Sequence, residues 1–370
     1  MFSIVKFMLL LLLSMNVMAG QKVLTAEEYE EAMNKCNSAP PYYGYKFNQV
    51  EIDALLKQWI PLHHAWKQEL EEEVEDTLLH SEQMKLIHNS PYAKDPRKIN
   101  LCGANLTELD LSYKDLSWAD FSHSKAKKID LSNTVLILAK LDRANLTEAD
   151  LWAANLTQAS LKWTKLYKAD LEAANLQFAQ LERTNLSHAL LEDANLSQAD
   201  IGRKTNFSYA QLTRTNLSKA NFKEVNFTQA HLNQAILSKA NFEEVNFTEA
   251  HLKQAVLSKA YFNKVNFTQA TLSDVNLTRA NLQKANFTQA ILEMVNFNKA
   301  QMNQANFTQA SLSEVGLNQT YLWSANFTGA SLTKMNLLQT ALIQANLANI
   351  ELIESQVLTE QALIFYEKEG

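Results

Sequence analysis

Glycine and proline are scarce in this chain, which holds only 7 glycines and 5 prolines among 370 residues. Average usage is about 7% for glycine and about 5% for proline, so collagen-like, proline-rich and glycine-rich linker architectures are excluded. A doubly wound nucleotide-binding enzyme also needs glycine in its tight turns and phosphate loops. The motifs G-x-G-x-x-G, G-x-x-x-x-G-K-[ST] and G-x-S-x-G are all missing. Nucleotide and hydrolase chemistry therefore have no support in the sequence.

A long apolar run occurs only at the N-terminus. Lys6 precedes the run Phe7–Leu13, and Val17–Ala19 has the small-x-small pattern of a cleavage site. The run is short for a helix that crosses a bilayer, which needs about 20 residues. We therefore expect residues 1–20 to be a signal peptide, with a retained N-terminal anchor as the alternative. On this interpretation the protein is exported, periplasmic or secreted, and is not an integral membrane protein.

The chain contains two cysteines, Cys36 in the N-terminal segment and Cys102 at the start of the repetitive region. An even number of cysteines in an exported chain favours pairing, because oxidising compartments preserve disulfides. A bond between Cys36 and Cys102 would join the two regions covalently. Two separate buried thiols are the alternative that the sequence leaves open.

A five-residue period dominates the chain from Leu101 to Leu352. A Leu or Phe stands at nearly every fifth position, with Ala, Val or Thr two positions before it and usually Asn or Asp directly before it. Five is neither the helical period of 3.6 nor the strand period of two. The pattern instead favours a coil with flat sides, each of which buries one large and one small residue. The step from Ile201 to Phe207 spans six residues, which predicts an insertion near 202–206.

A second period of 20 residues is visible in the later half of the chain. The ten residues KANFKEVNFT from Lys219 return with few changes from Lys239 and again from Lys259. Four pentapeptides therefore form one coil, and residues 20 apart stack on neighbouring coils. We expect a ladder of buried phenylalanines and a ladder of hydrogen-bonded asparagines: Phe227, Phe247, Phe267, Phe287, Phe307 and Phe327, and Asn206, Asn226, Asn246, Asn266, Asn286, Asn306 and Asn326.

These repeats resemble the pentapeptide-repeat family. Segments such as Ala144–Glu148 (ANLTE) and Ala305–Gln309 (ANFTQ) match its A-[ND]-L-x-x pattern, and matches continue over residues 101–356. The resemblance implies a mainly β fold, a right-handed quadrilateral β-helix solenoid, with the small residue and the Leu or Phe inside. C-terminal tails in this family can mediate dimer contacts, which implies a homodimer through the C-terminal helix expected at 357–370.

The segments outside the repeat have a different pattern. Residues 21–100 form an α-helical N-terminal region, in which we expect helices up to about Lys35, over Gln49–Trp59 and over Pro61–His88, with prolines as breaks. Residues 357–370 are expected to form a short capping helix. Solenoid ends expose core and unpaired strand, so we interpret both segments as caps.

Three aromatic residues form the first candidate binding surface. Trp152, Trp163 and Tyr167 occupy outward positions of the repeat in the first half of the solenoid. Exposed aromatic side chains are typical of protein–protein interfaces. We therefore expect an aromatic patch that binds a protein partner.

The second candidate surface is a column of positively charged residues, here named the basic column. Its members are spaced 20 residues apart and should line one outer face: Lys219, Lys239, Lys259, Arg279 and Lys299. Such a row of like charges attracts a polyanion. A solvated charged face is the alternative interpretation, and Glu224 and Glu244, expected one side over, would partly neutralise the column.

No catalytic or metal constellation stands out. His231 and His251 are 20 residues apart and should be neighbours, but Thr271 follows them in the column, so a third ligand is missing. Serine is scattered by the repeat, and no Ser/His/Asp arrangement can be singled out. We expect no cofactor and no enzymatic activity.

The charge of the solenoid bears on function. Some family members protect type II topoisomerases by imitating duplex DNA, which requires a strongly acidic rod. Here residues 101–201 hold 14 acidic and 10 basic residues, net −4, while residues 202–352 hold 8 and 13, net +5. This disfavours a DNA mimic, and nucleic acid is not an expected partner. We expect a non-enzymatic scaffold, periplasmic or secreted and a candidate secreted effector, that binds an unidentified protein or an anionic surface polymer.

Overall fold

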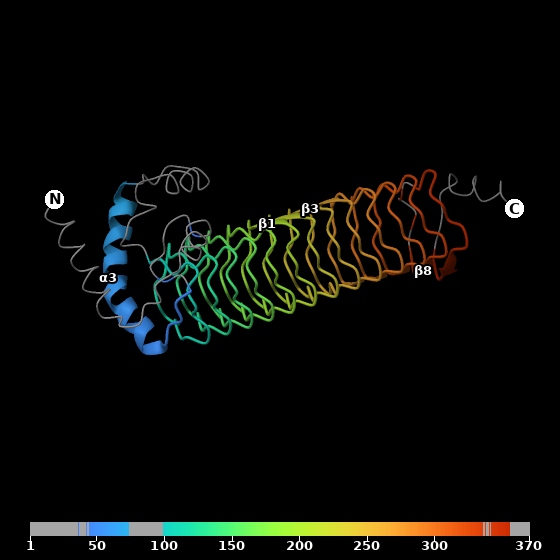
Figure 1. Cartoon of the computed structure of the whole chain (residues 1–370). Helices are drawn as coiled ribbons and strands as arrows, with labels where there is room; N and C mark the ends of the chain where they lie inside the picture. The colour runs from blue at the N-terminus through green and yellow to red at the C-terminus, as the bar shows by residue number, and fades with distance from the viewer. Residues whose placement is uncertain are drawn as a thin grey trace.

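The protein is an elongated solenoid of stacked coils. The computed structural model describes residues 36, 42, 44–73, 99–335, 337, 340 and 342–355. Helix α3 (Gln49–Glu73) lies across the N-terminal end of the stack (Figure 1). The expected signal peptide at 1–20, the helix up to Lys35 and the C-terminal helix at 357–370, with its dimer contact, lie outside these residues.

The repeat folds as a right-handed quadrilateral β-helix, as expected. Parallel bridges join residues 20 apart on neighbouring coils, such as Asn226 and Asn246. Within each pentapeptide the central large residue and the small residue before it are both buried, as at Leu151 and Ala149. The narrow interior is thus filled from every side with one large and one small side chain, which leaves no room for a cavity.

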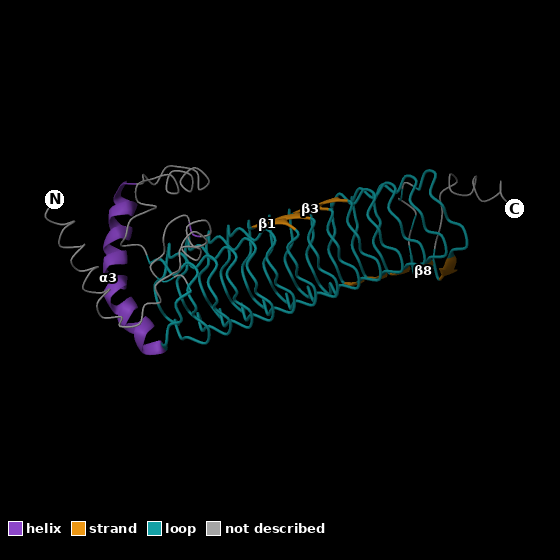
Figure 2. Ribbon diagram, viewed as in Figure 1, coloured by secondary structure: helices purple, strands orange, loops and turns teal. Residues whose placement is uncertain are grey.

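Two parallel sheets lie on opposite sides of the solenoid (Figure 2). In each sheet successive strands are hydrogen-bonded in sequence order, and the buried central residues pair in register, as Phe222 does with Phe242. The first sheet contains β1 (Asp200–Arg203), β2 (Asn221–Lys223), β3 (Asn241–Glu243) and β4 (Tyr261–Asn263). The second contains β5 (Thr271–Ser273), β6 (Ile291–Glu293), β7 (Ser311–Ser313), β8 (Ser331–Thr333) and β9 (Glu351–Ile353).

Every corner of the coil uses left-handed backbone. The residue two positions after the central Leu or Phe has a φ of 50° to 66° wherever it is not glycine. At many corners a turn closes with a backbone hydrogen bond, as from Ala149 N to Leu146 O at 3.1 Å, and such a turn needs a positive φ at its third residue. This conformation costs roughly 1–2 kcal/mol per residue. The corners form because burial of the four sides and hydrogen bonding between coils outweigh that cost.

The expected phenylalanine ladder is confirmed. The rings of Phe227 and Phe247 stack with centroids 4.9 Å apart, and the stacking continues at 4.8–5.0 Å to Phe327. A second ladder of Phe222, Phe242 and Phe262 stacks at 4.7 Å on the neighbouring side. The two ladders contact each other edge to face inside the coil, which makes aromatic packing the main content of the core in this half.

The expected asparagine ladder is confirmed as well. Asn286 Nδ2 donates to Asn266 Oδ1 at 3.0 Å and to Thr268 Oγ1 at 2.9 Å. The Thr268 hydroxyl in turn donates to Asn266 Oδ1 at 2.6 Å. The same contacts recur along this side of the solenoid, so the repeated Asn-x-Thr triplets have a structural role.

The one-residue insertion lies in β1. Its pairing register with β2 shifts between Asp200 and Arg203. Bridge partners that are 20 residues apart elsewhere are 21 apart here, as for Asn185 and Asn206. The bulge absorbs the extra residue locally, and the repeat continues beyond it with the same buried columns.

Gly202 makes this bulge possible, and we expect Gly202→Ala to destabilise the folded protein by about 1–3 kcal/mol. Its φ is 47°, and a Cβ would lie 2.8 Å from the Cβ and 2.9 Å from the Cα of Glu182 on the preceding coil. Urea unfolding measures the effect. Gly329→Ala is the matched control, because Gly329 also has a positive φ (67°) but the nearest atom, Gln309 Cγ, would be 3.6 Å away. Equal losses in both variants would contradict the clash.

Helix α3 differs from the expectation of two helices separated at Pro61. Gln49–Glu73 is one continuous helix with this proline inside it. The proline removes one backbone hydrogen bond, but Trp59 and Ile60 pack against the solenoid core directly before it. That burial stabilises the helix through the proline. Among the described helical residues none forms a segment long and apolar enough to cross a bilayer.

The segment before α3 covers the open edge of the first coil. Lys46 forms a parallel bridge with Asn105, and Phe47 N donates to Asn105 O at 3.1 Å. The carboxamide of Gln49 then pairs with the backbone of Asp110: Asp110 N donates to Gln49 Oε1 and Gln49 Nε2 donates to Asp110 O, each at 2.8 Å. A side chain thus continues the pairing where the strand ends, which blocks edge-to-edge association here.

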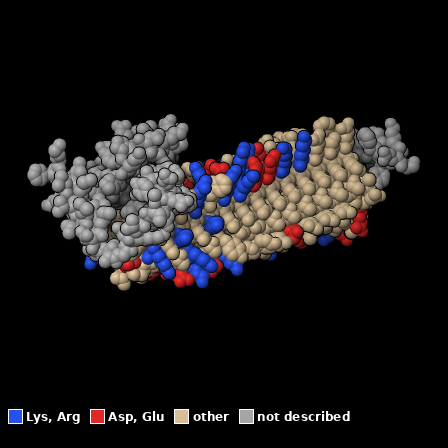
Figure 3. All heavy atoms as spheres, in the orientation of Figure 1, with Lys and Arg blue, Asp and Glu red and all other residues tan. Residues whose placement is uncertain are grey.

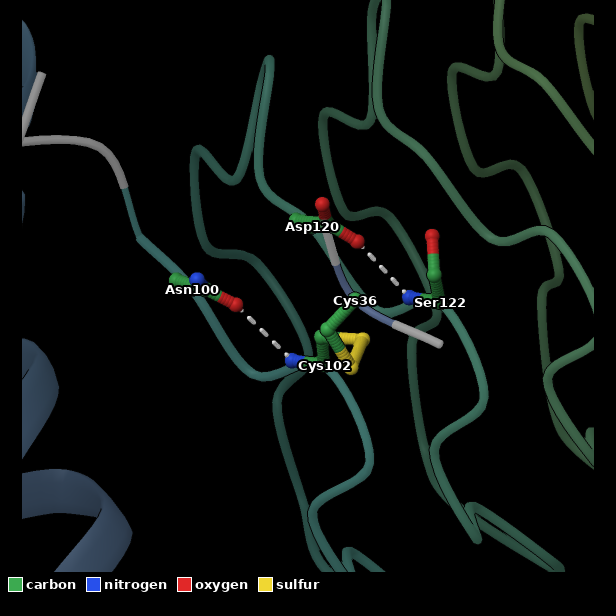
Figure 4. Close-up of a disulfide and its surroundings, with 5 residues drawn as sticks. All are labelled: Cys36, Asn100, Cys102, Asp120 and Ser122. Carbon is green, nitrogen blue, oxygen red and sulfur yellow. Dashed lines mark hydrogen bonds between the residues drawn. A yellow bond between two sulfur atoms is a disulfide. The ribbon is translucent and has the colours of Figure 1, made fainter. Parts of the chain in front are cut away.

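A disulfide joins Cys36 to Cys102, 66 residues further along the chain. Figure 4 shows Cys102 on the first coil beside Asn100, whose Oδ1 accepts a hydrogen bond from Cys102 N at 3.1 Å. Both cysteines are buried. Of the two alternatives that the sequence leaves open, the structure has the paired one, and it fastens the N-terminal segment to the solenoid.

Candidate functional site

Trp163 lies on a corner between two arginines from the coils on either side. The guanidinium carbon of Arg183 is 4.1 Å and that of Arg143 is 5.2 Å from the ring centroid. The indole is 44% exposed, and cation–π attraction holds the three side chains together. The arginines therefore occupy positions that a partner would need in order to pack against the ring faces.

The structure does not bring the three candidate aromatic residues together. Trp152 belongs to a different column of the solenoid from Trp163, and Tyr167 to a third. Tyr167 instead contacts His188 edge to face, with ring centroids 5.5 Å apart, and Lys168, whose Nζ lies 5.4 Å from its ring centroid. Within the described residues no ring contact joins the three, so they form separate features rather than one patch.

The basic column is a straight row on one corner of the solenoid. All five of its residues are exposed. Each donates its backbone N–H to the next coil, as from Lys239 N to Ser258 O at 3.1 Å and from Lys259 N to Thr278 O at 3.0 Å. Because hydrogen-bonded coils are about 4.8 Å apart, the five charges recur at that spacing on a rigid support.

The acidic residues expected to neutralise this column pair elsewhere. Glu224 forms an ion pair with Arg203 at 3.6 Å. Lys264 Nζ donates to Glu244 at 2.8 Å, and this hydrogen bond keeps the pKa of Glu244 below its ordinary value. In the described part of the chain no ion pair joins a carboxylate to a cation of the column. The column is therefore less neutralised than the sequence indicates.

A depression follows the column in its second half. It is open to solvent, has a volume of about 430 Å³ and is lined by Ser258, Lys259, Asn276, Thr278, Arg279, Asn298 and Lys299. Figure 3 shows how charged side chains gather along the edges of the visible face, with a broad uncharged surface between them. The charged groups of the solenoid are thus concentrated at its edges.

A second column of polar side chains, one position before the cations, was missed by the sequence analysis: Ser218, Ser238, Ser258, Thr278 and Asn298. Ser and Thr recur at this position on every side, so residue type alone did not mark them. On the asparagine-ladder side the Thr268 hydroxyl donates to Asn266. The hydroxyls of Ser238 and Ser258 make no hydrogen bond to the described residues, because Ile236 and Val256 stand where an asparagine would accept it. That substitution is the signal that the sequence offered.

His231 and His251 stack on neighbouring coils, with ring centroids 4.9 Å apart. Burial, and secondarily the charge of His251, keep the pKa of His231 below its ordinary value of 6.5. Across the described ranges no group of three or more His, Cys, Asp or Glu side chains is placed to hold a metal ion. We therefore assign the pair no metal-binding role.

Comparison with protein families identifies the repeat. A profile described as pentapeptide repeats (8 copies) matches six overlapping segments between 115 and 243 and a further segment at 310–349. A profile described as pentapeptide repeat region matches residues 231–307. Together the matches extend over more than half of the chain. Comparison with curated proteins finds no match.

Several solved structures of pentapeptide repeat proteins are similar to this chain. HetL, involved in heterocyst differentiation regulation in the cyanobacterium Nostoc, is 28% identical over 61% of this chain and 90% of its own, with a TM-score of 0.25. Full-length QnrB1, a plasmid-mediated fluoroquinolone resistance protein, is 20% identical over 57% of this chain and 97% of its own, with a TM-score of 0.29. A protein from the thylakoid lumen of Arabidopsis thaliana is 30% identical over 28% of this chain and 69% of its own, with a TM-score of 0.19. These similarities concern the repeat and identify no shared site.

Proposed function

Because this chain belongs to the pentapeptide repeat family, whose members are in general non-enzymatic repeat scaffolds, we propose that it is an exported scaffold that binds an anionic polymer along its basic column. The observation that carries the proposal is the row of five exposed cations without ion pairs to the described carboxylates. The solenoid supplies the rigid support, and the column supplies the attraction.

The column has no evident role in stabilising the fold. Where the solenoid uses lysine between coils, it places a glutamate 20 residues away, as in the pairs of Lys264 with Glu244 and of Lys334 with Glu314 at 3.2 Å. Five like charges at about 4.8 Å repel one another instead. A polyanion would relieve that repulsion, and release of its counterions would favour binding.

Two features support export. The pattern from Lys6 to Ala19 is typical of a signal peptide. The disulfide between Cys36 and Cys102 is stable in the periplasm or outside the cell but not under cytosolic reduction. The proposed ligand is therefore a polymer of the cell surface or its surroundings.

DNA mimicry is the alternative function, and the charge of the solenoid disfavours it. Residues 202–352 carry 8 acidic and 13 basic residues, net +5, which is the opposite of a DNA surface. The similarity to QnrB1, at 20% identity, concerns the fold alone. A protein partner is the other alternative, and the test below distinguishes it.

Reversing the charge at the middle of the column tests the proposal. Replacing Lys239, Lys259 and Arg279 by glutamate is expected to weaken the affinity for heparin roughly 100-fold or more, and wild-type affinity is expected to fall as salt rises. Titration calorimetry at several salt concentrations measures both. The fold accepts glutamate at such corners, since Glu224 and Glu244 have φ values of 52° and 55° there.

A second triple variant controls for net charge. Lys204, Lys253 and Lys284 are exposed and lie outside the column, and their replacement by glutamate changes the net charge equally. This variant is expected to bind heparin almost as well as the wild type. Equal losses in the two variants would show that net charge, not the column, governs binding. Unchanged binding in both would reject the column and favour a protein partner.

A further inference from the structure

The spacing of the basic column restricts the polymers that match it. Its charges recur at every coil, about 4.8 Å apart, in a straight line. An extended acidic peptide presents side chains to one face only at every second residue, about 6.7 Å apart. Duplex DNA carries one phosphate per about 3.4 Å of axis on each strand, and each strand winds away from a straight row. A linear glycan with one carboxylate on each sugar extends by a length similar to one coil per charge.

The hydroxyl groups beside the cations add a second requirement. Ser238 and Ser258 hold hydroxyls that no described residue engages, and each stands directly before a cation. In the depression the hydroxyls of Ser258 and Thr278 lie among the cations Lys259 and Arg279. A ligand that fits this strip offers carboxylates and hydroxyls side by side, and both are present on every unit of an acidic sugar chain.

The other flank of the column is uncharged. Two positions beyond the cations stand Asn221, Asn241, Tyr261, Asn281 and Gln301. The ring of Tyr261 is 50% exposed and follows Lys259 with only the buried Ala260 between them. Amides and one exposed aromatic ring suit the polar edges and the apolar face of a sugar. A single-stranded nucleic acid would instead need aromatic rings for successive bases, and this flank has a single such ring among the five positions.

We propose that the ligand of the basic column is a linear polyuronate, a glycan with one carboxylate on each sugar, lying along the axis of the solenoid. This inference rests on the proposed function. The cations bind successive carboxylates, the column of Ser and Thr hydroxyls binds sugar hydroxyls, and Tyr261 packs against a sugar ring. The register between sugars and coils, rather than charge alone, selects this polymer.

Galacturonate oligomers of increasing length test the register. Affinity for the full chain is expected to rise with each added sugar until the oligomer has five carboxylates, one for each cation, and to rise little beyond that. A methyl-esterified pentamer, which keeps the sugars and loses the charges, is expected to bind at least about 100-fold more weakly. A pentanucleotide and a pentaglutamate serve as probes of similar charge. If either binds as tightly as the galacturonate pentamer, the inference is wrong.

Removing the hydroxyls separates this inference from simple charge attraction. The double variant Ser258→Ala, Thr278→Val is expected to weaken binding of the galacturonate pentamer roughly tenfold and to leave heparin binding nearly unchanged. Gln254→Ala and Gln289→Ala, on other corners, should change neither.

The outcomes distinguish the two proposals. If the charge-reversed column loses heparin while the pentamer shows no preference and no dependence on the hydroxyls, the inference fails and the proposed function stands. If no polyanion depends on the column, both fail.

Discussion

Replacing Phe267 by alanine is expected to lower the free energy of unfolding by about 3–5 kcal/mol. The side chain is fully buried. Its ring stacks on Phe247 and on Phe287, with centroids 4.9 Å away in both directions, and contacts Phe262 edge to face at 5.8 Å. The backbone of the neighbouring coils is fixed by hydrogen bonds, so the cavity left by the ring cannot collapse.

Chemical denaturation followed by circular dichroism measures this loss, and Gln269→Ala is the control. Gln269 is exposed on a corner, where its amide donates to Gln289 at 3.2 Å, and its replacement should cost less than about 0.5 kcal/mol. Thr268 is a poorer control than its outward position indicates, because its hydroxyl belongs to the asparagine ladder. A small effect of Phe267→Ala, similar to that of Gln269→Ala, would contradict the assignment of inward and outward positions.

Removing the disulfide is expected to cost about 4 kcal/mol of stability in the chain-entropy account of a loop of this length. Cys36 and Cys102 are 66 residues apart, so the bond restricts a large part of the unfolded chain. The double variant Cys36→Ala, Cys102→Ala removes the bond without leaving a free thiol. Its denaturation midpoint should fall well below that of the oxidised wild type.

Reduction of the wild-type protein is the matched control for this variant. Reduced wild type and the double variant should unfold at similar denaturant concentrations, because both lack the bond. A midpoint equal to that of the oxidised protein in both cases would mean that the N-terminal segment adds nothing to the stability of the solenoid.

The fold of the repeats could be predicted because the same environment recurs in every coil. Phe227 and Phe247 have the same neighbours 20 residues before and after them, so one period of the sequence describes the packing of all. The second ladder, at Phe222 and Phe242, has the same spacing and was accessible by the same reasoning. Repetition replaces the distant contacts that make other folds hard to predict.

The N-terminal region could not be predicted to the same degree, because its contacts occur once. The pairing of Gln49 with Asp110 joins positions 61 residues apart through a single side chain. The continuity of α3 through Pro61 depends on the burial of Trp59 and Ile60 against the solenoid. Local pattern contains neither contact, so it predicted a helix boundary that packing overrides.

For the candidate site, spacing predicted which residues align but not which of them pair. The 20-residue interval placed Lys239 and Lys259 in one row, and the same interval would have placed Arg143 and Arg183 beside Trp163. Whether a glutamate neutralises the row depends on the corner that it occupies. Only the coordinates show that the glutamates pair with cations of another corner.

Lysine acetylation with and without bound heparin is the most direct test of where the polymer lies on the wild-type protein. Mass spectrometry reports the modification of each lysine. The account predicts that Lys219, Lys239, Lys259 and Lys299 are protected together when heparin is bound, while the exposed lysines outside the column (Lys204, Lys253 and Lys284) react as in the free protein. Protection of those three lysines instead, or no difference between the two groups, would contradict the claim that the basic column is the binding site.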